Sequence, residues 1–96
     1  MTLEAGAQIW VPCEVKPGPF SDERLVRVRD NGSEWLGFVP ASRLKEPILE
    51  GVTFIGALVV SVLGEKFKAR MPGEAVTPGL FEGAVARVRP LGPLEA

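Results

Sequence analysis

The sequence predicts an all-β protein, on the evidence of its turn residues and of the patterns between them. The 96 residues include 11 Gly and 9 Pro, so turns are frequent and long helices are not expected. Between the turns, short segments alternate apolar and polar side chains, as strands with one buried face do. The length fits a single domain, residues 1–96, built as a small barrel of about six or seven strands.

The clearest strand pair surrounds an Asn-Gly dipeptide at positions 31–32. This dipeptide is typical of a two-residue type I′ turn, because both of its central positions need a positive φ. Such a turn places Val28 opposite Trp35 on one face and Arg29 opposite Glu34 on the other. The first pair is apolar and the second is oppositely charged, so the predicted register is consistent on both faces.

A second hairpin is predicted around the Gly-Glu turn at 64–65. Continuous pairing from this turn places Val62 opposite Phe67 and Val60 opposite Ala69 on a buried face. The expected strands are Gln8–Val15, Arg24–Asp30, Glu34–Pro40, Gly56–Leu63, Lys66–Met71 and Gly83–Arg89. The remaining expected segments are a helical turn at Ala41–Glu46 and a C-terminal tail, residues 90–96.

The chain also contains a weak internal repeat. Residues 11–29 and 71–89 share a Pro-Gly-x-Phe segment and end on Arg-Val-Arg, with one gap on each side. Either two copies of one β unit were fused, or similar turns recur by chance in a chain rich in Pro, Gly and Val. If the repeat is real, Phe20 and Phe81 have the same structural position, and we expect both to cap the barrel rather than contact a ligand.

Residues Glu34–Lys45 read EWLGFVPASRLK and resemble the end of an SH3 domain. There, a Trp-bearing strand leads to Gly-x-Val-Pro, a 3₁₀ turn and a last apolar residue. The residues that carry the similarity are Trp35, Gly37, Val39, Pro40, Ser42 and Leu44. The resemblance implies an SH3-like barrel, as in bacterial SH3-type domains. The internal repeat leaves a tandem of two such half-barrels as the alternative. The resemblance does not imply binding of Pro-rich peptides, because a chain without Tyr cannot build the usual aromatic groove.

Residues Val59–Val76 read VVSVLGEKFKARMPGEAV and resemble the first two strands of the OB-fold in the S1 and initiation-factor-1 type of RNA-binding protein. That family pairs a Val-rich strand with a strand of alternating Lys and Arg, and it stacks bases on aromatic side chains. Here Phe67 is expected to face inward, and no other aromatic residue lies on the basic strand. The chain departs from the family's pattern at this point.

The basic strand supplies most of the candidate binding residues. A period of two places Lys66, Lys68 and Arg70 on one face, and Arg87 and Arg89 extend this face if the last strand pairs nearby. The face either follows a phosphate backbone or is a solvated strand surface that prevents edge-to-edge association. The second interpretation is the simpler one.

Two further residues have chemistry that a site can use. Trp10 is the candidate for an exposed aromatic contact, because Trp35 lies opposite Val28 and belongs to the core. Cys13 is expected to be a small buried apolar residue, since the chain has no His that could form a catalytic dyad with it.

Composition argues against several classes of function. With no His, no Gly-rich phosphate loop and no EF-hand spacing, the sequence predicts no catalytic residue, metal site or cofactor. The net charge of −1 argues against a dedicated nucleic-acid binder. The single Cys, the absence of a signal-peptide pattern and the absence of an apolar segment of about 20 residues favour a cytoplasmic protein that is not in a membrane.

The function predicted from the sequence is therefore non-catalytic. Protein–protein interaction or assembly is favoured, with a second copy or another protein as the partner. The alternative is binding of RNA or single-stranded nucleic acid through the face of Lys66, Lys68 and Arg70. Nucleic-acid binding requires a contiguous positive face and an affinity that falls with salt, whereas assembly requires an exposed apolar patch.

Overall fold

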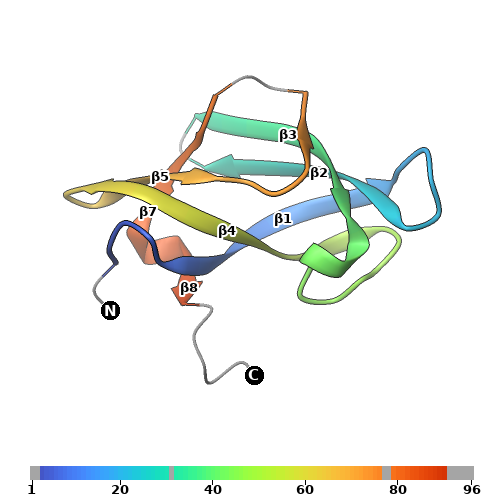
Figure 1. Ribbon diagram of the computed structural model, residues 1–96, viewed down its shortest axis with the longest axis horizontal. Helices are drawn as coiled ribbons and strands as arrows, with labels where there is room; N and C mark the ends of the chain where they lie inside the picture. Colours follow the sequence, from blue (N-terminus) through green and yellow to red (C-terminus); the bar gives the residue numbers. More distant parts are fainter. Residues whose placement is uncertain (1–2, 31, 77–78, 91–96) are drawn as a thin grey trace.

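The computed structural model describes residues 3–30, 32–76 and 79–90, and only the backbone of residues 89 and 90. The predicted all-β class is confirmed, since the described residues form strands and two short 3₁₀ turns (Figure 1). In chain order the elements are β1 (Gln8–Pro17), β2 (Glu23–Asp30), β3 (Ser33–Pro40), η1 (Ala41–Arg43), β4 (Gly51–Leu63), β5 (Lys66–Arg70), β6 (Glu74–Ala75), β7 (Phe81–Ala84), η2 (Val85–Arg87) and β8 (Arg89–Pro90).

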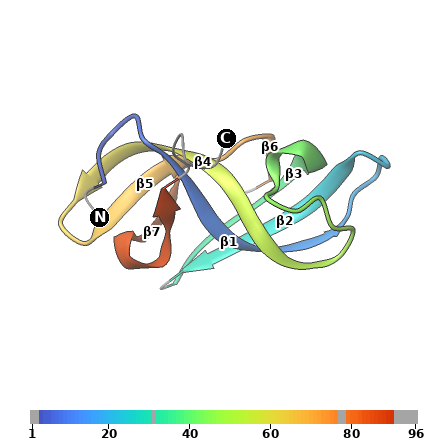
Figure 2. The same cartoon turned by 90° about the horizontal axis from the view of Figure 1, so that it is seen from below.

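The strands form one antiparallel sheet in the order β6-β3-β2-β1-β4-β5-β7. β4 pairs with β1 from Gln8 to Val15, whereas the other edge of β1 pairs with β8 at Ile9 and Trp10 and with β2 from Glu14 onward. The sheet curls, so that β7, at one end of the order, contacts β2 and β3 near the other end (Figures 1 and 2). The result is a curled half-barrel, which is compatible with the predicted small barrel.

The core fills the concave side of this sheet with the inward residues of each long strand. Every second residue of β1 is buried, as period-two alternation requires: Ile9, Val11, Cys13 and Val15. Phe67 and Phe81 are the largest fully buried side chains. Their rings meet edge to face, with centroids 6.2 Å apart and an interplanar angle of 63°.

The first hairpin has the predicted register throughout, from Glu23 opposite Pro40 to Asp30 opposite Ser33. Val28 and Trp35 are buried together, as the sequence predicts. Asn31 lies outside the described residues, and Gly32 has the positive φ, 88°, that the turn needs.

The second hairpin contains a β-bulge that the sequence analysis did not predict. Val62 pairs with Phe67 as expected, but the register shifts between Val59 and Ser61, so that Val59 rather than Val60 lies opposite Ala69. Val59 is therefore buried, and Val60 is 39% exposed. The predicted Val60–Ala69 pair is wrong because one extra residue in β4 reverses which side chains face the core.

The last predicted strand, Gly83–Arg89, is wrong as a continuous element. β7 ends at Ala84, the turn η2 follows, and β8 then pairs with β1. The buried Asp30 side chain fixes this change of direction, because its Oδ2 atom accepts a hydrogen bond of 2.7 Å from the Ala84 N–H. Its Oδ1 atom lies 3.4 Å from Nε of Arg87 on η2.

The two Phe residues of the internal repeat have different environments. Phe81 is 1% exposed and fills the core, as expected, but Phe20 is 68% exposed, so its predicted role as a cap is wrong. Backbone hydrogen bonds of 3.1 Å, from Gly18 N–H to Glu23 O and from Glu23 N–H to Phe20 O, close the loop tightly and leave Phe20 at its tip. The repeat itself stays a prediction.

The helical segments among the described residues are short 3₁₀ turns. η1 ends at Arg43, earlier than the predicted turn at Ala41–Glu46. In the described part of the chain, no helix has the length and apolar character needed to cross a bilayer. The predicted tail, residues 90–96, lies outside the described residues apart from the backbone of Pro90.

Cys13 is expected to resist alkylation in the folded protein. Burial raises the pKa of its thiol to about 12, and a hydrogen bond with the Thr53 backbone offsets this only in part. Because the thiolate is the reactive form, iodoacetamide at pH 8 should leave the native protein unmodified and label it fully in concentrated urea. Rapid labelling of the native protein, followed by mass spectrometry, would show that Cys13 is not in the core.

Candidate functional site

A groove lies on the outer face of the sheet, where β1, β4 and the end of β5 meet η1. Its open volume is about 340 Å³. The residues that line it are Gln8, Trp10, Arg43, Gly56, Ala57, Leu58, Arg70, Met71 and Pro72. The groove therefore combines a largely apolar floor with two guanidinium groups, and no carboxylate lines it.

The strand register explains why this hollow forms. Trp10 of β1 lies opposite Gly56 of β4, so the large indole has a neighbour without a side chain. Two residues further along β4, Leu58 has Gln8 on one side and Arg70 on the other. Because outward residues recur every second position, these side chains all project from the same face.

Trp10 contributes a partly exposed aromatic surface. It is partly buried, whereas Trp35 is only 3% exposed, so Trp10 is the more accessible of the two, as the sequence predicts. Its indole nitrogen is buried and has no acceptor among the described residues. The part of the ring that reaches the groove is therefore carbon, a surface on which a planar group can stack.

Arg43 is a groove residue that sequence reasoning missed. After η1 the chain runs alongside β4: Leu44 forms an isolated bridge with Ile55, and the Lys45 N–H donates a 2.8 Å hydrogen bond to Phe54 O. Leu44 is buried while Arg43 and Lys45 are exposed. The alternation basic-apolar-basic at 43–45 was the available signal, but the sequence analysis assigned this segment to a helical turn.

Five exposed basic side chains follow one side of β4, and we call them the basic rail: Lys45, Arg43, Arg70, Lys68 and Lys66. They come from two segments that are far apart in the sequence. β5 runs beside β4 from Leu58 to Leu63, and residues 43–45 run beside β4 near Phe54. The Nζ atom of Lys45 lies 5.6 Å from the centre of the Phe54 ring. Basic charge and aromatic surface therefore occur together along this line.

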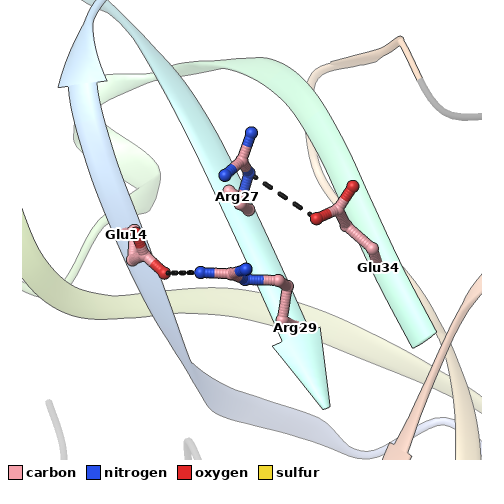
Figure 3. Close-up of polar contacts among 4 residues, drawn as sticks. All are labelled: Glu14, Arg27, Arg29 and Glu34. Atoms are coloured by element: carbon pink, nitrogen blue, oxygen red, sulfur yellow. Dashed lines mark hydrogen bonds and ion pairs between the residues drawn. The ribbon is translucent and has the colours of Figure 1, made fainter. Parts of the chain in front are cut away.

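The basic rail has no ion pair within the described residues, whereas Arg24, Arg27 and Arg29 have polar partners. On the outer face of β2, Arg29 lies 2.9 Å from Glu14 Oε1 and Arg27 lies 3.6 Å from Glu34 Oε2 (Figure 3). The hydrogen bond from Arg29 lowers the pKa of Glu14. Arg24 is buried, and its guanidinium donates to the backbone carbonyls of Ser21, Glu23 and Ile48. Unlike Arg27 and Arg29, the rail cations have no ion-pair partner among the described residues to give up when an external anion binds.

The predicted site residues are thus brought together only in part. Lys66, Lys68 and Arg70 share an exposed face, and Arg70 and Trp10 both line the groove. Glu82 of β7 lies opposite Lys68 and weakens the positive charge at that end. Arg87 does not extend the face, because it lies on η2 beside Asp30. Arg89 pairs with Trp10 through its backbone, and its side chain is outside the described residues.

No family model, curated protein or solved structure matches the chain. Among the described residues, no group of three or more Cys, Asp and Glu side chains could hold a metal ion. The groove and the basic rail are therefore the features from which a function has to be argued.

Proposed function

We propose that this protein is a non-catalytic domain that binds single-stranded nucleic acid, in particular RNA, through the groove and the basic rail. One observation carries the proposal: unpaired basic side chains from two distant segments align along β4 beside partly exposed aromatic rings. Proteins that bind single strands combine a basic track for the phosphates with aromatic surfaces for the bases. A cytoplasmic location, which the sequence predicts, belongs to the same proposal.

The local distribution of charge supports this alternative over the protein partner that the sequence favoured. The net charge of −1 is an average over the chain: Glu14, Glu34 and Asp30 are paired with arginines away from the rail, whereas Glu82 lies opposite Lys68. At the Arg43 and Arg70 end of the rail, where no carboxylate lines the groove, an approaching anion meets a local positive field rather than the average charge of the chain. An acidic protein segment is the competing partner, because Leu58 and Val60 expose apolar surface beside the same rail.

Binding of a fluorescently labelled 12-nucleotide oligouridine, followed by anisotropy, tests the proposal. With three or four phosphates neutralised, the affinity should fall about 20- to 50-fold between roughly 50 and 200 mM salt. An unlabelled polyglutamate competitor of matched charge should displace the RNA poorly, because it offers no bases to stack. Absence of binding at the lower salt concentration would refute the proposal, and equal competition by polyglutamate would favour an acidic protein partner instead.

A further inference from the structure

The basic rail accounts for contacts with phosphates, but it does not account for the shape of the groove. At about 340 Å³, the groove is at the small end of the range for ligand pockets, which suits one planar group rather than several. Its walls include carbon atoms of the Trp10 ring together with Leu58 and Met71. A base placed here stacks on one aromatic surface and is enclosed by aliphatic side chains.

The polar side chains at the groove are almost entirely donors. The Arg43 and Arg70 guanidinium groups donate and never accept, and only the amide of Gln8 can do both. Acceptor atoms of a ligand can therefore accept hydrogen bonds from Arg43 or Arg70. An exocyclic amino group that faces either guanidinium has no acceptor there and stays unpaired. A buried polar group without a partner is costly.

We propose that the groove is a nucleobase subsite that prefers guanine to adenine, an inference that rests on the proposed function. Guanine presents O6 and N7, two adjacent acceptors that match the fork of one arginine, whereas adenine presents an amino group beside N7. Arg43 or Arg70 supplies the fork, and Trp10 supplies the stacking surface. The second arginine stays available for the adjoining phosphate.

Two 12-nucleotide oligouridines that differ only in one central base, guanine or adenine, test this inference by anisotropy. The guanine oligomer should bind about tenfold more tightly, and replacing its base by 7-deazaguanine, which lacks the N7 acceptor, should remove most of that advantage. Equal affinities of the guanine and adenine oligomers would overturn the subsite while leaving the proposed function intact. Failure of both to bind would overturn the two proposals together.

A charge-conserving variant separates recognition of the base from attraction to phosphate. Arg43→Lys/Arg70→Lys keeps both positive charges but removes both planar guanidinium groups, so the guanine oligomer should bind this variant no more tightly than the adenine oligomer does. The matched control is Arg27→Lys/Arg29→Lys on the outer face of β2, which should keep the preference. A preference that survives in Arg43→Lys/Arg70→Lys would contradict the assignment of the subsite to these arginines.

Discussion

Replacing Phe67 with Ala should lower the free energy of unfolding by about 3–5 kcal/mol. Phe67 is 1% exposed and packs edge to face with Phe81, so removal of its ring leaves a cavity and one unpaired aromatic partner. Urea denaturation followed by Trp fluorescence measures the change, since Trp35 lies in the same core. If the Ala variant does not fold, Phe67→Leu should still be destabilising, at lower cost.

The matched control is Phe20→Ala, which removes the same ring from an exposed loop and should change stability by no more than about 0.5 kcal/mol. The comparison also bears on the binding surface. Because side chains alternate along a strand, the inward position of Phe67 is what points Lys66 and Lys68 outward. Equal effects of the two substitutions would mean that β5 is oriented differently, and the basic rail would not exist as described.

Removing the two guanidinium groups of the groove should weaken RNA binding by about tenfold for each residue, or about 100-fold for Arg43→Gln/Arg70→Gln. Both side chains are exposed and have no ion pair within the described residues, so the free energy of unfolding should change by less than about 0.5 kcal/mol. Anisotropy with labelled oligouridine measures the affinity, and urea denaturation shows that the fold is retained.

The control variant Arg27→Gln/Arg29→Gln removes the same amount of charge from the outer face of β2. These arginines already pair with Glu34 and Glu14, so their loss should reduce the affinity by less than about threefold. If the two double variants lose affinity equally, the RNA responds to the total charge of the protein rather than to the groove.

Local signals were enough to predict the first hairpin. An Asn-Gly turn fixes a two-residue loop, and the register of every pair from Asp30 and Ser33 outward then follows from the strand period. The second hairpin has an equally clear turn, but the bulge in β4 shifts the pairs beyond Ser61. No residue type marks this bulge in the sequence, and the bulge lies beyond the part of β4 that pairs with β1.

Only those residues of the candidate site that follow from the alternation within a single strand could be predicted from the sequence. The alternation of Lys66, Lys68 and Arg70 with buried residues is visible in the sequence, and so was Trp10 as the more exposed of the two Trp residues. Arg43 joins them because residues 43–45 and β5 both run beside β4, a contact between distant segments. The chain direction after Ala84, which carries Arg87 away from the rail, depends in the same way on the distant Asp30 side chain.

The salt dependence of binding tests the central claim most directly. With oligouridine, which offers no guanine to either arginine, the slope of log affinity against log salt concentration should be negative for the wild type. It should be less steep by about 1.4 for Arg43→Gln/Arg70→Gln, since each lost phosphate contact to a single strand contributes about 0.7. The slope for Arg27→Gln/Arg29→Gln should equal that of the wild type. Three parallel slopes would contradict the claim that the groove and the basic rail hold the phosphates.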